Sequence, residues 1–375
     1  MIYLDYNATT PVAPEVARAI SDYLIREYGN PSCDYALGWR AKMAVDKARA
    51  QVADLLGAHP EEIVFTSGAT EANNTVIRGV ARHFGQGHII TSAVEHPAVT
   101  APCRWLASQG FEVAWLPVDG AGLVDPEAVR RALTPRTILI SIMHANNETG
   151  ALQPIAAIGE VARAAGVWLH TDAAQSVAKV PVRVDELQVD FLSVAGHKFY
   201  APKGVGALYV RPGCKFVPLL QGAGQEGGRR AGTENVPYIV ALGEAGRLAR
   251  ERLAGDGQHL RTLRDLLHGR LAAGFPGLAL NGPETARLPN TLNVSFPGIS
   301  GCDLLSGLPN LAASVGAACH TGEVAVSPVL AAMQVPPEIA RGAVRLSVGR
   351  PTTREEVEQA AEMLLAVVKT LVRRN

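Results

Sequence analysis

Cysteine is scarce in this sequence of 375 residues, and neither sign of charge is in excess. The five cysteines are an odd number and include no CxxC pair, which argues against a disulfide framework and a structural zinc ribbon. Lysine and arginine together number 35, as do aspartate and glutamate, so no net basic charge is available to neutralise nucleic-acid phosphates. We therefore expect a protein of the reducing cytoplasm that has no nucleic-acid partner.

Long hydrophobic runs are also missing. No stretch of 18 apolar residues occurs, and the opening residues MIYLDYNATTP have neither the basic segment nor the apolar core of a signal peptide. We expect no membrane segment and no secretion signal. Aromatic residues make up only 5%, but 47% of the residues are apolar and 19% are charged, which excludes a disordered chain. At roughly 100–200 residues per domain, the length allows two or three domains.

Short apolar runs alternate with helix-period segments over the first two thirds of the chain. The runs with the length and composition of buried strands are residues 62–66, 88–91, 112–116, 137–142, 167–171, 191–194 and 206–210. The segments with helical periodicity are residues 45–56, 69–84, 99–109, 125–133 and 155–165. Repeated strand–helix–strand units predict an α/β fold with a mainly parallel sheet between helices.

The pattern changes after about residue 235. Residues 236–271 predict one or two amphipathic helices. Residues 290–296 alternate like a half-exposed strand, and residues 344–348 predict another strand. Strands followed by helices, without the earlier strict alternation, are typical of a smaller α+β domain.

The last helix has a clear start signal, and the change of pattern along the chain indicates two domains. Thr353 and Glu356 have the spacing of a capping box before a helix that ends near residue 372. We predict a large domain over residues 15–254. The small domain is predicted to combine residues 1–14 with residues 255–375.

Two glycine-containing segments are candidates for binding phosphate. The segment TSGATE, which holds Ala69 and Thr70, follows a predicted strand and opens a helix, where free N–H groups and the helix dipole favour an anion. An ordinary capped turn is the alternative interpretation. The segment GAGQEG at 222–227 matches GxGxxG, but the loop-like GGRRAGTEN follows it in place of a helix. A nicotinamide site is therefore not supported.

Titratable residues follow several predicted strands. Asp172 could hold a proton on a heterocyclic nitrogen or simply cap a helix. Lys198, amid Gly, His and aromatic residues, is a candidate for a Schiff base, because partial desolvation lowers a lysine pKa. Lys203, in a Pro-Lys-Gly turn, is the more exposed rival. His96 could stack on an aromatic cofactor or have a structural role.

One cysteine differs from the others in its surroundings. Cys319 lies among small residues in the segment ASVGAACHTG, which predicts a loop of the second domain. A buried structural cysteine is usually flanked by larger apolar residues, so this setting fits an accessible nucleophile. A loop cysteine without a role is the alternative.

In their joint order, these motifs resemble the cysteine desulfurase and selenocysteine lyase family, which belongs to the fold-type I, class V pyridoxal-phosphate enzymes. The resemblance covers nearly the whole chain. It is carried by YLDYNATTP, FTSGATEANN, TSAVEHPAV, ANNETG, HTDAAQ, GHKFYAPKGVGALYVR, GRRAGTENVP, SVGAACHTG and VRLSVGRPTT. It implies pyridoxal 5'-phosphate as cofactor, L-cysteine or L-selenocysteine as substrate and L-alanine as product. It also implies a homodimer and an acceptor protein for the sulfur or selenium.

The resemblance assigns roles to individual residues. Lys198 would hold the cofactor as a Schiff base, His96 would stack on its ring, and Cys319 would accept sulfur or selenium. Asn147 and Arg345 would receive the substrate carboxylate. The implied cofactor-binding residues are Ala69, Thr70, His96, Asn147, Asp172, Gln175, His197, Lys198 and Thr233, the last from the partner subunit.

Two segments depart from the family pattern. Ala195 stands before GHK where many desulfurases have serine, so one hydroxyl contact to the phosphate is missing. The cysteine segment reads VGAACH, and GAACH and GHKFY are closer to the selenocysteine lyase branch. Both branches share their catalytic groups, so the branch stays open. A class V aminotransferase or kynureninase-like enzyme is an alternative, although transamination needs no thiol at Cys319. A non-catalytic sulfur-relay partner is another, and the presence of Lys198, Asp172 and His96 together argues against it.

Overall fold

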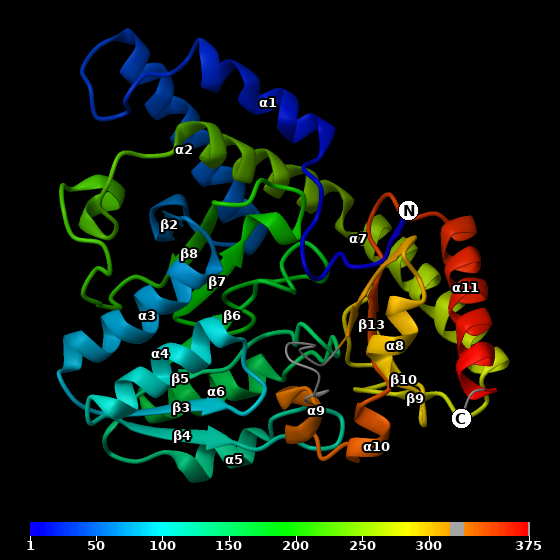
Figure 1. Cartoon of the computed structure of the whole chain (residues 1–375). Helices are drawn as coiled ribbons and strands as arrows, with labels where there is room; N and C mark the ends of the chain where they lie inside the picture. Colours follow the sequence, from blue (N-terminus) through cyan, green and yellow to red (C-terminus); the bar gives the residue numbers. More distant parts are fainter. Residues whose placement is uncertain (316–325, 374–375) are drawn as a thin grey trace.

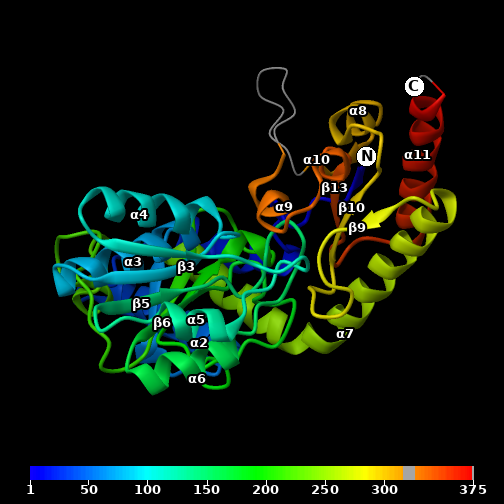
Figure 2. The same cartoon turned by 90° about the horizontal axis from the view of Figure 1, so that it is seen from below.

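The computed structural model describes residues 1–315 and 326–373, so Cys319 lies outside the described residues. The chain forms a larger unit around a seven-stranded sheet and a smaller unit around a four-stranded sheet (Figure 1). Helix α7 (Val236–Gly274) runs from the larger unit along the smaller one (Figure 2). The N-terminus and the C-terminus both lie at the smaller unit.

The large sheet confirms the predicted α/β fold with a mainly parallel sheet. Its strands are β2 (Ile63–Thr66), β3 (His88–Ser92), β4 (Glu112–Leu116), β5 (Thr137–Ser141), β6 (Trp168–Asp172), β7 (Phe191–Ala195) and β8 (Gly206–Val210), in the order β2-β8-β7-β6-β5-β3-β4. Strands β3, β4, β5, β6 and β7 are parallel to one another, whereas β8 is antiparallel to its neighbours β7 and β2. The carboxyl ends of β3, β5, β6 and β7 therefore meet at one edge, where ligands of such sheets bind.

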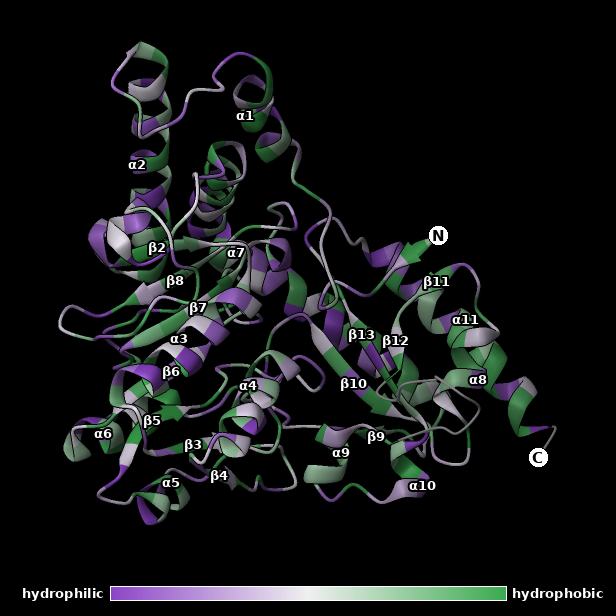
Figure 3. Cartoon of the chain, turned by 60° about the vertical axis from the view of Figure 1, so that its left-hand side comes forward, coloured by the Kyte–Doolittle hydropathy of each residue, from purple (hydrophilic) through white to green (hydrophobic). Residues whose placement is uncertain are grey.

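Helices cover both faces of this sheet. They are α1 (Pro14–Ile25), α2 (Ala36–Leu56), α3 (Ala69–Phe84), α4 (Pro97–Ser108), α5 (Pro126–Ala132) and α6 (Ile155–Ala165). Successive strand residues point to opposite faces, so Ile89 joins the core under α3 and α4 while Ile90 joins the core under α2, α6 and α7. Figure 3 shows the hydrophobic residues concentrated along the strands.

The smaller unit is antiparallel. Its sheet has the order β12-β13-β10-β9, and its elements are β9 (Ala279–Leu280), β10 (Thr291–Ser295), β12 (Ser314–Val315), β13 (Ala343–Ser347), α8 (Gly301–Ser306), α9 (Pro328–Ala332), α10 (Pro337–Ala340) and α11 (Arg354–Val372). Strand β1 (Ile2–Tyr3) pairs in parallel with β11 (Leu311–Ala312). Residues 2 and 3 thus pack beside a segment that is far away in the sequence.

Strand β10 differs from the prediction of a half-exposed strand, because all five of its residues are buried. Leu292 and Val294 pack into the core of the smaller unit. The polar side chains on the other face meet the larger unit, where Asn293 Nδ2 donates a hydrogen bond of 3.2 Å to the carbonyl oxygen of Glu148. The alternation of apolar and polar residues therefore marks a contact between the two units rather than a surface.

Helix α7 contributes to both hydrophobic cores. Its buried residues up to Ala249 belong to the core of the larger unit, and those from Leu260 belong to the core of the smaller unit. The N-terminal segment does the same, since Leu4 packs in the smaller unit and Val16 in the larger. The predicted domain limit between residues 254 and 255 falls inside α7, and it remains a prediction.

Candidate active site

A cavity of about 480 Å³ lies at the carboxyl edge of the parallel strands, and both units contribute to its wall. It brings together most of the residues singled out in the sequence. They are Ala69, Thr70, His96, Asn147, Asp172, Gln175, His197, Lys198 and Arg345, and the rival Lys203 also lines the cavity. Thr233 does not line it but borders a neighbouring hollow, which shares Ser67 and Gly204 with the cavity.

The turn between β2 and α3 is suited to an anion. Gly68 has φ +150°, a backbone conformation that other residues rarely adopt, and no side chain caps the first N–H groups of α3. His197 also lines the cavity, and its Nδ1 lies 3.1 Å from Thr9 Oγ1. Burial, together with nearby lysines, lowers the pKa of His197 to about 4, so its ring is neutral at pH 7. Because no side chain caps them, the backbone N–H groups of Ala69 and Thr70 are available for a phosphate.

Asp172 ends strand β6 as a buried carboxylate with a fixed orientation. Its Oδ1 accepts a hydrogen bond of 2.9 Å from the N–H of Ala174, and its Oδ2 accepts one of 2.7 Å from Asn73 Nδ2. Asn73, on α3, is fully buried. A carboxylate held in this way at the end of a parallel strand can keep a proton on a basic ring nitrogen.

Lys198 lies at the end of β7, in the short turn η2 (Gly196–Lys198). Its Nζ donates hydrogen bonds of 2.6 Å to the carbonyl oxygen of Asn7 and 2.9 Å to that of Ala8. Burial, with a further contribution from the positive charge of Arg345, lowers the pKa of Lys198 to about 8. A lysine with this pKa is neutral often enough at pH 7 to attack an aldehyde. Lys203, in contrast, is exposed.

His96 caps the N-terminus of α4. Its Nδ1 accepts a hydrogen bond of 3.1 Å from the N–H of Ala98, so in the neutral ring Nε2 carries the proton. Burial lowers the pKa of His96, and the nearby Lys198 lowers it further, while Asp172 opposes this effect. A neutral, flat imidazole therefore lines the cavity and can stack on a ring.

Glu95, the neighbour of His96, is buried away from solvent. Its Oε1 accepts hydrogen bonds of 2.6 Å from Ser92 Oγ and 2.9 Å from the N–H of Met143. Burial raises the pKa of Glu95 to about 8, and the charge of Asp172 adds to this. These contacts tie the turn that carries His96 to the segment after β5.

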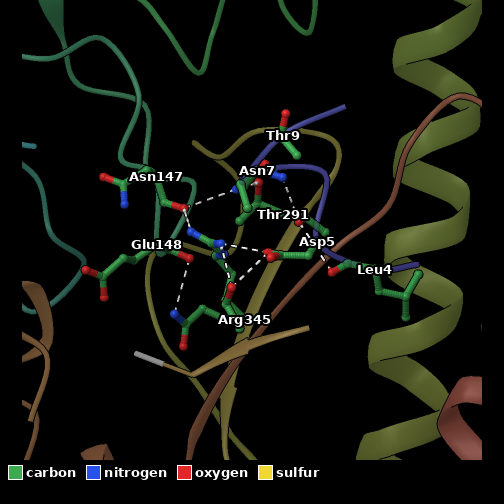
Figure 4. A network of polar contacts seen from close by, with 12 residues as sticks. Leu4, Asp5, Asn7, Thr9, Asn147, Glu148, Thr291 and Arg345 are labelled. Carbon is green, nitrogen blue, oxygen red and sulfur yellow. Dashed lines mark hydrogen bonds and ion pairs between the residues drawn. The ribbon is translucent and has the colours of Figure 1, made fainter. Parts of the chain in front are cut away.

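Arg345 reaches the cavity from β13 and is held by several acceptors (Figure 4). Its Nη2 lies 2.7 Å from Asp5 Oδ1 and 2.9 Å from Ser314 Oγ. Its Nη1 donates to the carbonyl oxygen of Asn147 at 3.0 Å. Within the residues described, the buried Nε has no partner. The guanidinium is thus fixed in place, and two of its five N–H groups have no partner among the described residues.

Several residues of the site were not singled out in the sequence. Asp5 and Asn7 lie inside the motif YLDYNATTP, and Asn73 lies inside FTSGATEANN, but nothing in their residue type distinguished them. Nothing in the sequence marks Lys179 and Glu95 as buried residues of the site, because charged residues are usually exposed. Each of them is placed by contacts with residues far away in the sequence.

Two further kinds of site can be assessed over residues 1–315 and 326–373. In this part of the chain, no group of three or more His, Cys, Asp or Glu residues could hold a metal ion. None of the helices described there is both long enough and apolar enough to cross a membrane.

Pyridoxal phosphate carries an anionic phosphate, a basic ring nitrogen and an aldehyde, and the cavity offers a suitable partner to each. The uncapped start of α3 can take the phosphate, Asp172 can pair with the ring nitrogen, and Lys198 can react with the aldehyde. The residues present therefore fit this cofactor. The fold and the cavity together define a pyridoxal-phosphate-dependent enzyme built on an α/β scaffold.

Comparison with known proteins gives the family. The sequence profile of the family described as Aminotransferase class-V matches residues 2–360. The chain belongs to this family, whose members depend on pyridoxal phosphate.

Individual relatives resemble the chain over nearly its whole length. A protein of Methanosarcina thermophila named cysteine desulfurase IscS is 48% identical over 99% of this chain and 92% of its own length. A protein of the same name from Dictyoglomus turgidum is 44% identical over 99% of this chain and 95% of its own length. Among solved structures, a NifS-like protein has a TM-score of 0.92 at 38% identity, covering 98% of this chain and 99% of that chain. The structure of SspA in complex with cysteine has a TM-score of 0.83 at 37% identity, covering 94% and 100%.

Proposed function

We propose that this chain is a cysteine desulfurase, which removes sulfur from L-cysteine and forms L-alanine. The observation that carries the proposal is the placement of Lys198 and Asp172 in one cavity that Arg345 completes from the smaller unit. Relatives named cysteine desulfurase, at 48% and 44% identity, support this choice among the activities of the family. So does the similarity to SspA, which was solved in complex with cysteine.

Each residue has a distinct task in this reaction. Bound pyridoxal phosphate supplies an electron sink for the carbanion at the substrate Cα. Arg345 binds the substrate carboxylate, and Asp172 keeps the proton on the ring nitrogen. Lys198 Nζ removes the proton from Cα and later returns a proton to the product. The thiolate of Cys319 attacks the substrate sulfur, the C–S bond breaks, and a persulfide forms on Cys319 while the three-carbon fragment leaves as alanine.

L-Selenocysteine is the second substrate that we propose. The segments GAACH and GHKFY resemble the selenocysteine lyase branch, and an ionised selenol is a better leaving group than a thiol. Parallel kinetics with L-cysteine and L-selenocysteine would give the preference between sulfur and selenium. Turnover of L-cysteine alone would remove the selenium proposal.

We propose a homodimer as the active form. We also propose that it works in the cytoplasm and passes sulfur to an acceptor protein there. Thr233 lies 35 residues beyond Lys198 in the sequence and borders a hollow beside the cavity rather than the cavity itself, which supports a role toward the phosphate of a second subunit. A persulfide at Cys319 needs reducing surroundings to be transferred onward. The mass in solution, measured by light scattering, should be twice that of one chain.

The central experiment measures both products and the lysine. With an added thiol that reduces the persulfide, the purified protein should release alanine and sulfide from L-cysteine, and borohydride should trap pyridoxal phosphate on the peptide that contains Lys198. In a Lys198→Ala variant the visible cofactor absorption should be lost, whereas Lys203→Ala should keep the adduct at Lys198. An oxo acid in place of alanine would indicate an aminotransferase. A colourless protein without any adduct would favour the alternative of a non-catalytic sulfur-relay partner.

A further inference from the structure

A second lysine lies buried behind the wall of the cavity. Lys179 is 8% exposed, and it is not among the residues that line the cavity. Its Nζ donates hydrogen bonds of 2.8 Å to Gln175 Oε1 and 3.2 Å to Asn7 Oδ1. No carboxylate among the described residues forms an ion pair with it, and the mechanism above does not use it.

The contacts of Gln175 fix the orientation of its amide. Its Nε2 donates a hydrogen bond of 2.9 Å to the carbonyl oxygen of Asn7, an atom that can only accept. Its Oε1 then faces Lys179, whose amine donates. A flipped amide would set two carbonyl oxygens against each other and an NH₂ group against the lysine. Since Gln175 lines the cavity, the polar group that it presents there is the second hydrogen of Nε2.

Asn7 Oδ1, the second acceptor of the Lys179 amine, is also fixed in its orientation. Asn7 Oδ1 also accepts a hydrogen bond of 3.0 Å from Asn290 Nδ2, and Asn7 Nδ2 donates one of 2.8 Å to Thr291 Oγ1. The Asn7 side chain therefore cannot turn without losing contacts to the smaller unit. The Lys179 amine thus donates to two oxygens that other contacts already hold in place, Gln175 Oε1 and Asn7 Oδ1.

Burial of Lys179 is costly, which indicates that the amine has a task. Burial lowers its pKa well below the ordinary value, and the positive charges of Lys198 and Arg345 lower it further. A methionine would fill a similar volume without any buried charge. What the lysine supplies and methionine lacks is the N–H donor toward Gln175.

We propose that Lys179 is a positioning residue, which holds the Gln175 amide so that an N–H group faces the phenolic oxygen of the cofactor ring, the group that the family resemblance assigns to Gln175. Without Lys179, only the Asn7 carbonyl oxygen would oppose a flip of the amide, and a flipped amide would offer the ionised phenolic oxygen a repelling carbonyl. The inference rests on the proposed function, and it goes beyond it by giving a role to a residue outside the cavity.

The test uses Lys179→Met, Gln175→Leu and the double variant. The readouts are the affinity of the apoenzyme for pyridoxal phosphate and the pH midpoint of the visible absorption of the bound cofactor. A lost hydrogen bond to an ionised oxygen disfavours the ionised form, so Lys179→Met should raise the midpoint by about one unit and weaken cofactor binding about tenfold. In the Gln175→Leu background, Lys179→Met should cause no further shift, because its effect passes through Gln175.

Two further variants separate the hydrogen bond from the charge. Lys179→Gln removes the charge but keeps an N–H donor, so its shift should be less than half of the shift of Gln175→Leu. Lys215→Met removes an exposed lysine outside the cavity and should leave both readouts unchanged. If Lys179→Met does not fold, Lys179→Ala, which also lacks the N–H donor, takes its place in both backgrounds.

Some outcomes would overturn the inference. They are an unchanged midpoint in Lys179→Met, a shift in Lys179→Gln as large as that of Gln175→Leu, or equal shifts of Lys179→Met in both backgrounds. A chain that binds no pyridoxal phosphate in its unmodified form would instead overturn the proposed function. A chain that binds it normally but ignores every change at position 179 would overturn the positioning role alone.

Discussion

Arg345 and Asp5 form an ion pair in which Nη2 and Oδ1 lie 2.7 Å apart, although 340 residues separate them in the sequence. The pair is largely buried, with 11% and 17% of the two side chains exposed. Asp5 thereby holds the guanidinium at the cavity before any substrate arrives. In the proposed function, a substrate carboxylate would therefore meet a positive group that is already oriented.

Replacing Arg345 with lysine should weaken substrate binding without loss of the cofactor. Lysine keeps the charge but lacks the planar fork that binds a carboxylate with two hydrogen bonds. A lost charge-assisted hydrogen bond corresponds to a rise in KM of about 10- to 100-fold. Steady-state kinetics with L-cysteine, together with the visible spectrum, would check this. A lower kcat at an unchanged KM would show that Arg345 acts elsewhere in the reaction.

Lys198 should titrate far below an ordinary lysine in the apoenzyme. Burial lowers its pKa from 10.5 to about 8, so the reactive neutral amine should increase as the pH rises through about 8. Brief acetylation of the apoenzyme at a series of pH values, quantified on the Lys198 peptide by mass spectrometry, measures this midpoint. Exposed Lys215 is measured in the same samples as the comparison. A shared midpoint for the two lysines would contradict the effect of burial.

Replacing Cys319 with serine should separate cofactor binding from sulfur transfer. A hydroxyl group cannot accept sulfur as a persulfide, so we expect the loss of sulfide release from L-cysteine by at least about a hundredfold. The visible absorption of the cofactor should stay unchanged, because Cys319 has no proposed role in holding it. Cys103, which is fully buried in the core, provides a matched Cys→Ser control for the activity. Full activity in Cys319→Ser would remove the nucleophile from the proposal.

Glu95 should make the stability of the chain depend on pH. Its pKa is raised from 4.5 to about 8, so the folded chain keeps a proton that the unfolded chain has released. The free energy of unfolding therefore falls as the pH rises through this window. Glu95→Gln, which is neutral at every pH, should gain at least about 1 kcal/mol relative to the unmodified chain between about pH 5 and pH 9.

Denaturant unfolding at several pH values measures the effect of Glu95→Gln. A Glu95→Leu variant is the control, since it leaves the N–H of Met143 without its acceptor and should be about 2 kcal/mol less stable than Glu95→Gln at any pH. A stability difference between the glutamine variant and the unmodified chain that does not vary with pH would show that Glu95 is ionised in the folded chain.

The sheet could be predicted from the sequence because each central strand is a short apolar run between turns. Strand β4, Glu112–Leu116, has the predicted bounds, and β5, Thr137–Ser141, ends one residue earlier than predicted. The first part of α2 was not predicted. Trp39 and Met43 lie there with 56% and 71% exposed, so apolar residues on the outer face obscure the helical period.

The site could be predicted only in part, and the reason is physical. Asp172 and Lys198 follow buried strands, so the rule that ligands bind at the carboxyl ends of strands identifies them. Asn7 and Lys179 meet only after the smaller unit packs against the larger one, and their contact joins residues 172 positions apart. No local pattern records such a contact, and a lysine is ordinarily a surface residue.

The pairing of β1 with β11 has a consequence for biosynthesis. Residues 2 and 3 leave the ribosome long before their partners at 311 and 312. The N–H of Asn7 likewise finds its acceptor, the hydroxyl of Ser347, only after that residue has been made. A nascent chain can thus complete the large sheet before the smaller unit closes the cavity. A fragment released before residue 345 would carry Lys198 without Arg345, to which we assign the substrate carboxylate.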